Sequence, residues 1–161
     1  MASEDEPLER AKALALKLLA HRARSQEEVR RRLERKGFAA EVVGATLARL
    51  RELGYLDDGA YARSRAESLL ARGRLAPAAV ERRLSASGVA APTARAAVDE
   101  ARGERTERDL ARACLEARRP ALERGSPLAE RIRAARFLAG RGFSEEVVRE
   151  VVGLDEGPAE P

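Results

Sequence analysis

One pattern of residues occurs three times in this chain, and this internal repeat restricts the possible folds more than any other feature of the sequence. In each copy an apolar residue is followed four positions later by Leu, eight positions later by Gly and nine positions later by another apolar residue. The glycines of the three copies are Gly37, Gly88 and Gly142. A repeat of this length is typical of small helical units that stack on their neighbours.

Each copy predicts a short helix that ends in a turn. Two apolar residues four positions apart, such as Val29 and Leu33, lie on one face of a helix. A glycine at the helix end supplies left-handed backbone, and the apolar residue after it packs back on the helix. An apolar stripe of helical spacing precedes each copy, and another follows it; the first of these is Ala11, Leu14, Ala15, Leu18 and Leu19. Each unit is therefore expected to contain three helices.

The composition agrees with an all-α chain. Ala, Leu, Arg and Glu are good helix formers and dominate the sequence, aromatic residues make up 3%, and alternating strand-like runs are absent. We predict an all-α fold of three tandem three-helix repeats in an elongated array, with its curvature left open. The expected repeats are residues 8–54, 55–102 and 103–153, and acidic disordered segments are expected at residues 1–7 and 154–161.

Residues that begin or break helices agree with these repeats. Ser25 and Glu28 have the spacing of a capping box at the start of the second helix. Pro77 and Pro92 stand where a first helical turn accepts proline. The stretch from Pro120 to Pro127 is expected to interrupt the third repeat.

The sequence lacks the residues from which most active sites are built. A single cysteine, Cys114, excludes a disulfide within the chain, and its apolar setting predicts a buried thiol. The single histidine, His21, stands at the end of a predicted helix, and Asp57 and Asp58 stand at the start of another, where capping is the ordinary role. No glycine-rich phosphate loop occurs. We therefore expect no catalysis, cofactor, metal or small-molecule substrate.

The same sequence indicates where such a chain works. No apolar run approaches the roughly 18 residues of a membrane span, and the acidic first residues are unlike a signal peptide. A cytoplasmic protein without membrane contact is the expectation. A monomer is also expected, because the charged faces leave no obvious further apolar stripe.

Positive charge is concentrated in the first predicted repeat. The net charge of the chain is only +4, yet residues 9–51 contain 12 Lys and Arg against 5 Asp and Glu. Such a patch favours contact with phosphate or with an acidic partner. On the second helix Arg31 and Arg35 are expected to point away from the core, while Arg32 and Lys36 lie nearer its boundary. The candidate contact residues are Arg24, Arg30, Arg31, Arg35 and Lys36.

Two stretches resemble a known family. Gly54-Tyr-Leu-Asp-Asp58, followed by Tyr61-Ala62, is similar to the junction between the first two repeats of RecX regulatory proteins, and Phe137-Leu-Ala-Gly-Arg-Gly-Phe-Ser144 resembles their final repeat. The resemblance covers roughly residues 11–153. It implies three three-helix repeats and a non-enzymatic protein that binds the RecA filament and inhibits its ATPase, recombinase and co-protease activities; several members also bind DNA. We expect the Tyr55 ring to pack between repeats and Asp57 to cap the next helix.

Two other functions fit the repeats. Residues 29–36, 37–38 and 41–53 superficially resemble a helix-turn-helix, which would make the chain a stand-alone DNA-binding module. However, residues 41–53 contain no Asn, Gln or Ser for contacts to base edges. The third possibility is a helical scaffold for an unrelated partner, which the repeat pattern alone does not exclude.

Overall fold

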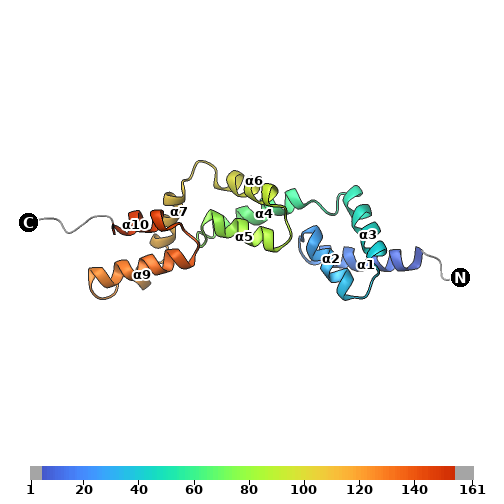
Figure 1. Ribbon diagram of the computed structural model, residues 1–161, viewed down its shortest axis with the longest axis horizontal. Coiled ribbons are helices and arrows are strands. Elements are labelled where there is room, and N and C mark those ends of the chain that lie inside the picture. Colours follow the sequence, from blue (N-terminus) through green and yellow to red (C-terminus); the bar gives the residue numbers. More distant parts are fainter. Residues whose placement is uncertain (1–4, 155–161) are drawn as a thin grey trace, which may run out of the picture. The chain divides into compact units, whose positions relative to one another are not determined.

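The computed structural model describes residues 5–154, which form ten helices and no strand (Figure 1). The all-α prediction is therefore confirmed. In chain order the helices are α1 (Asp5–His21), α2 (Gln26–Arg35), α3 (Ala40–Glu52), α4 (Asp58–Ala71), α5 (Pro77–Ala86), α6 (Ala91–Arg102), α7 (Glu107–Glu116), α8 (Arg119–Leu122), α9 (Pro127–Gly140) and α10 (Glu145–Val152).

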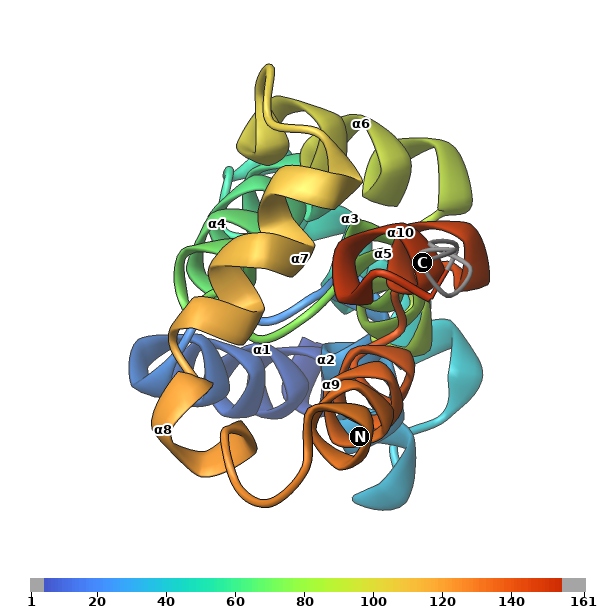
Figure 2. The ribbon, with the colours of Figure 1, turned by 90° about the vertical axis from the view of Figure 1, so that its left-hand side faces the viewer.

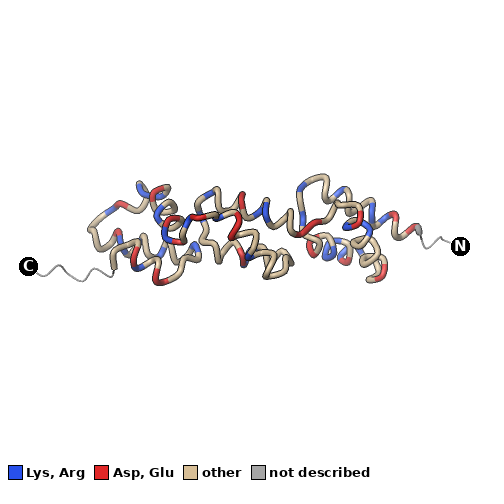
Figure 3. Tube along the Cα trace, turned by 90° about the horizontal axis from the view of Figure 1, so that it is seen from above, with Lys and Arg blue, Asp and Glu red and all other residues tan. Residues whose placement is uncertain are grey.

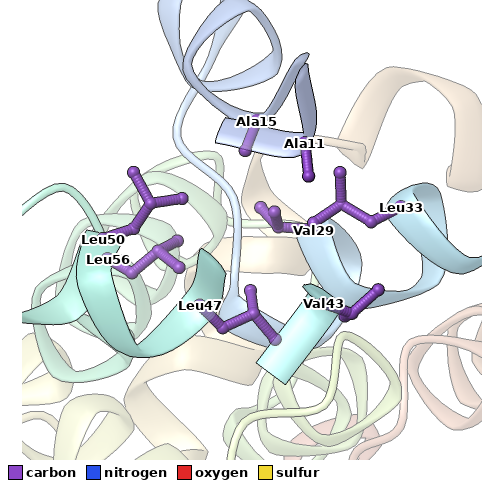
Figure 4. Close-up of a cluster of buried hydrophobic side chains, with 8 residues drawn as sticks. All are labelled: Ala11, Ala15, Val29, Leu33, Val43, Leu47, Leu50 and Leu56. Atoms are coloured by element: carbon purple, nitrogen blue, oxygen red, sulfur yellow. The ribbon is translucent and has the colours of Figure 1, made fainter. Parts of the chain in front are cut away.

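The first three helices pack on one another around a shared apolar core. Small residues of α1, Ala11 and Ala15, face larger side chains of α2 and α3, and Leu56 closes the core from the segment after α3 (Figure 4). Burial of each leucine contributes roughly 1.5–3 kcal/mol relative to an exposed side chain. The other members of this core are Val29, Leu33, Val43, Leu47 and Leu50.

The last helices form a second packed group. Helices α7, α9 and α10 pack on one another in pairs, and the short α8 packs on α9 (Figure 2). Their buried apolar residues are Leu110, Ala111, Cys114, Leu138, Phe143, Val148 and Val152. The three-helix arrangement that the repeat pattern predicts is thus present at both ends of the described chain.

Contacts within the chain define two compact units. One contains the chain up to Ser64 together with Leu84–Ala97, and the other contains Arg65–Arg83 together with the chain from Val98. Helices α4, α5 and α6 each contribute residues to both units. The residue limits of the three repeats stay a prediction.

The repeated glycines have the backbone conformation that the sequence pattern predicts. Gly37, Gly88 and Gly142 have φ values of 85°, 86° and 89°. After each of the helices α2, α5 and α9 the glycine amide donates to a carbonyl three residues earlier, and the next amide donates to a carbonyl five residues earlier. This pair of bonds is the Schellman motif, which explains why an apolar residue follows each glycine.

The prolines and the start of α1 also bear on the predicted organisation. Pro77 begins α5, Pro92 lies in the first turn of α6, and α8 interrupts the third repeat between α7 and α9, as predicted. The expectation of disorder at residues 1–7 is wrong for residues 5–7, because α1 already begins at Asp5. Glu6 is favourable at a helix N-terminus, and Pro7 is tolerated in a first turn. Residues 1–4 and 155–161 lie outside the described residues.

Candidate functional site

A groove rich in arginine lies between the end of α1 and the exposed side of α2. Its volume is about 790 Å³, and we call it the basic groove. Basic and acidic positions are both present along this part of the chain (Figure 3), but five arginines face two glutamates in the groove itself. The lining residues are Leu18, Arg22, Arg24, Glu28, Arg31, Arg32, Glu34 and Arg35.

Some of these arginines are already engaged within the protein. An Arg22 guanidinium nitrogen lies 2.7 Å from Oε1 of Glu28, and Nε of Arg24 donates to the Leu18 carbonyl at 3.3 Å. Nε of Arg31 lies 3.0 Å from Oε1 of Glu27. These contacts hold one side of the groove in place and reduce the positive charge that it presents.

The remaining positive charges of α2 are available to a partner. Arg32, Arg35 and Lys36 are exposed and have no carboxylate partner within residues 5–154. Arg35 uses only its Nε, which donates to the Arg31 carbonyl at 3.3 Å. Guanidinium groups with free donors suit bidentate contact with phosphate or carboxylate.

The Glu28 carboxylate joins the groove to the start of α2. Its Oε2 accepts from the Ser25 amide at 3.0 Å, while the Ser25 hydroxyl accepts from the Glu28 amide at 3.1 Å, so the predicted capping box is confirmed. Burial acts to raise the pKa of Glu28, but the hydrogen bonds from Arg22 and from the Ser25 amide together lower it. The contacts with Arg22 and the Ser25 amide therefore favour the ionised form of the Glu28 carboxyl.

The structure places the predicted contact residues in two groups. Arg24, Arg31 and Arg35 line the basic groove, whereas Arg30 and Lys36 do not. Arg30 forms an ion pair with Glu27 at 3.3 Å. Whether these five residues bind a partner stays a prediction.

Two groove residues were absent from the sequence-based set. The sequence places Arg22 beside Arg24 just before the cap of α2 but does not show its ion pair with Glu28, and helical geometry places Arg32 near the core boundary. The structure shows Arg32 exposed, as is Lys36, because the core contact of α2 is narrow and uses mainly Val29 and Leu33. The exposed stripe of α2 is therefore wider than helical geometry alone predicts.

The stretch from Gly54 to Asp58 has a mainly structural role. Oδ1 of Asp57 accepts from the Ala60 amide at 2.9 Å in the first turn of α4, which confirms the predicted cap. Oδ1 of Asp58 accepts from the Gln26 amide at 2.8 Å and so caps the start of α2. The Tyr55 prediction is wrong, since this residue is 56% exposed. Its turn faces solvent, while Leu56 enters the core.

The serine cap of α2 also makes a contact with a distant part of the chain. Ser25 is fully buried, and its hydroxyl donates to the Ser87 carbonyl in the turn after α5. Arg31 reaches the same turn through the Ala86 carbonyl at 3.4 Å. One edge of the groove is thus braced by the segment Leu84–Ala97 of the same compact unit.

The predicted burial of Cys114 is confirmed. Cys114 is only 2% exposed, and its burial raises the pKa of the thiol although Arg141 acts in the opposite direction. Within residues 5–154 no three His, Cys, Asp or Glu side chains come together as metal ligands. In the same residues we find no helix with the length and apolar character needed to span a bilayer.

Comparison with protein families identifies the chain. Residues 11–50 match the family model described as RecX, first three-helix domain, and residues 106–152 match the one described as RecX, third three-helix domain. The chain belongs to the RecX family. The two matches coincide with the helix groups α1–α3 and α7–α10 that pack around the two cores described above.

Similar RecX proteins cover most of the chain. The Regulatory protein RecX of Chlorobaculum tepidum is 36% identical over 143 residues, which are 87% of this chain and 84% of the relative. The Regulatory protein RecX of Thermobifida fusca is 36% identical over 147 residues, or 89% of this chain and 77% of the relative. Both relatives are named as regulatory proteins, which is consistent with a non-enzyme.

Solved structures show the same fold. The crystal structure of RecX from Lactobacillus salivarius matches with a TM-score of 0.78 over 92% of this chain and 96% of that one, at 16% sequence identity. A second crystal structure of a regulatory protein RecX matches with a TM-score of 0.75 at 19% identity, over 96% of this chain and 81% of that one. At this level of identity the RecX fold is kept while most side chains differ.

Proposed function

We propose that this RecX-family chain is a regulator of a RecA-type recombinase, and that it binds the filament that the recombinase forms on DNA. The basic groove is the surface that meets DNA phosphates or an acidic face of the filament. The observation that supports this most directly is the excess of arginine over glutamate in the groove, together with the free donors of Arg32 and Arg35. Binding inhibits the ATPase, recombinase and co-protease activities of the filament.

The remaining parts of the proposal concern how the chain acts. It works in the cytoplasm as a monomer, and it catalyses no reaction of its own. Contact with DNA is through backbone phosphates rather than bases, because no aromatic side chain lines the basic groove to stack on a base. Arg24, Arg30, Arg31 and Lys36 extend the contact surface beyond Arg32 and Arg35.

The test measures the single-strand-DNA-dependent ATPase of the recombinase while this protein is added below one molecule per recombinase subunit. The test variant carries Arg32→Glu with Arg35→Glu, because these exposed residues have no carboxylate partner within the described chain. The control carries Arg10→Glu with Arg51→Glu, which changes the net charge equally at exposed helix positions outside the groove. We expect inhibition by the wild type and the control and weak inhibition by the test variant.

Two results would contradict the proposal. An unchanged ATPase, with no co-sedimentation on the filament, would remove the recombinase as a partner. A salt titration would then separate the other two functions. Tight binding to DNA alone, with the logarithm of the binding constant falling against the logarithm of the salt concentration by about 0.7–0.9 per neutralised phosphate, indicates a DNA-binding module. Equal loss of inhibition in both double variants would instead assign the effect to net charge and not to the groove.

A further inference from the structure

A second basic site lies in the compact unit that contains α7, α9 and α10. It is a pocket of about 220 Å³, and we call it the arginine pocket. Four arginines reach it from three segments: Arg72 and Arg74 follow α4, Arg118 follows α7, and Arg141 is the C-cap of α9. Phe137 and Cys114 also line the pocket, and no Asp or Glu lines it.

The four guanidinium groups are not neutralised by the protein around them. Within residues 5–154 none of them has a carboxylate within ion-pair distance, and none donates a side-chain hydrogen bond to a carbonyl. This differs from the basic groove, where Arg22 and Arg31 are paired with glutamates. Like charges that converge without a counter-charge are costly, and such sites in proteins bind anions.

The C-termini of nearby helices compensate only part of the positive charge of these four arginines. Basic residues after a helix are favourable because each C-terminus carries about half a negative charge, and three helices end near the pocket. Those three ends together offset roughly one and a half of the four positive charges. Most of the positive charge is left for a ligand.

Phe137 holds two of the arginines in place. The guanidinium carbon of Arg141 lies 5.1 Å from the ring centroid, and that of Arg118 lies 5.9 Å from it. Both distances are within the range of cation–π attraction, which orients a guanidinium without using its hydrogen-bond donors. The donors of Arg118 and Arg141 are therefore positioned and still available.

We propose that the arginine pocket binds a phosphate group. A volume of about 220 Å³ is below the roughly 300–1,000 Å³ of pockets for whole organic ligands, which favours a compact anion. A phosphate monoester carries nearly two negative charges and three acceptor oxygens, whereas one carboxylate would leave most of the positive charge uncompensated. The phosphate is supplied by a free ion, by the end of a nucleic acid or by its backbone.

The first measurement is equilibrium binding of radiolabelled pyrophosphate to the full chain at constant ionic strength. The test variant is Arg72→Ala with Arg118→Ala, since both residues are exposed and their removal leaves the core unchanged. The matched control is Arg124→Ala with Arg136→Ala, two exposed arginines of the same unit that do not line the pocket. We expect the test variant to bind roughly tenfold more weakly for each lost charge-assisted contact, and the control to bind like the wild type.

Oligonucleotides distinguish the sources of phosphate. Single strands labelled at the 3′ end are compared with and without a 5′ phosphate, on the same three proteins. A preference for the 5′ phosphate that disappears in the test variant assigns the pocket to a nucleic-acid end. Equal loss for both strands in the test variant assigns it to the backbone, and an effect on pyrophosphate alone assigns it to a free ion.

A measurement on the wild type guards against misfolding of the variant. Because the pocket lies in the folded protein, bound pyrophosphate should raise the midpoint of thermal unfolding of the wild type as its concentration increases. The proposal is overturned if pyrophosphate neither binds nor raises this midpoint, if the control loses as much affinity as the test variant, or if a polyglutamate peptide binds the pocket more tightly than pyrophosphate. No recombinase is present in these assays, so their outcome is independent of the proposed function.

Discussion

Gly88 lies so close to Glu27 that a Cβ on the glycine would be 2.2 Å from the Cβ of the glutamate. Gly88 follows α5, and Glu27 lies in the first turn of α2. Gly142, which follows α9, lies in the same way against Ala79 of α5, where a Cβ would be 2.8 Å from the Ala79 Cβ. In each compact unit, the turn glycine of one repeat is therefore in contact with the second helix of the repeat before it.

The glycine of the first repeat provides a control for this contact. Gly37 has nearly the same φ as Gly88, but no atom lies within 4 Å of a Cβ placed on it. Gly37→Ala should cost about 1 kcal/mol, from the left-handed backbone alone. Gly88→Ala should cost about 2–4 kcal/mol, because the overlap with Glu27 adds to the same backbone penalty. Urea unfolding of the two variants measures this difference, and equal losses would show that the contact between repeats carries no energy.

Ser25 should be more important for stability than an ordinary helix cap. Its hydroxyl caps α2 and also donates to the Ser87 carbonyl, and the residue is fully buried. Ser25→Ala should cost about 2–3 kcal/mol of the free energy of unfolding, since the helix cap and the hydrogen bond to the Ser87 carbonyl are lost together at a fully buried position. Ser126→Ala, which removes an exposed cap of α9, should cost only about 1 kcal/mol in the same unfolding assay. A loss at Ser25 no larger than at Ser126 would contradict the role of the Ser87 bond.

The ion pair of Glu28 should make stability depend on pH in the acidic range. The pKa of Glu28 is lowered in the folded protein, so the unfolded chain binds the proton first as the pH falls. The stabilisation is therefore fully present above about pH 4.3, the ordinary value for Glu, and is lost below it.

The variant Glu28→Gln should have a free energy of unfolding about 1 kcal/mol lower than the wild type at neutral pH. This difference in stability should shrink as the pH falls through the acidic range. Thermal unfolding at several pH values measures this. Glu52→Gln breaks an exposed pair with Arg49 and should change stability little. A difference at Glu28 that does not vary with pH would argue against a charged partner.

The Cys114 thiol should react slowly in the native protein. It is nearly inaccessible, and burial raises its pKa, so the thiolate is both rare and shielded. Alkylation followed by mass spectrometry should give a slow rate in buffer and a fast rate in denaturing urea. A fast rate in buffer would mean that the region around α7 opens readily.

Much of the local structure was predictable because it depends on neighbouring residues. The spacing of Val29 and Leu33 defines a helix face, and a glycine four residues after the leucine ends that helix whatever lies around it. The capping box of Ser25 and Glu28 is local in the same sense. Arg31 and Arg35 were found from helical geometry, whereas Arg22 was missed because its place in the groove depends on its ion pair across the turn between α1 and α2.

The sequence by itself thus determined the helices, their stops and the concentration of positive charge in the first repeat. Only the tertiary structure decided which arginines share a groove, that Tyr55 is exposed, and that Arg72 and Arg74 meet Arg118 and Arg141 in one pocket. The physical reason is range. Helix periodicity and glycine backbone angles act over a few residues, but the meeting of segments such as Glu27 and Gly88 depends on how whole helices pack, which no local pattern encodes.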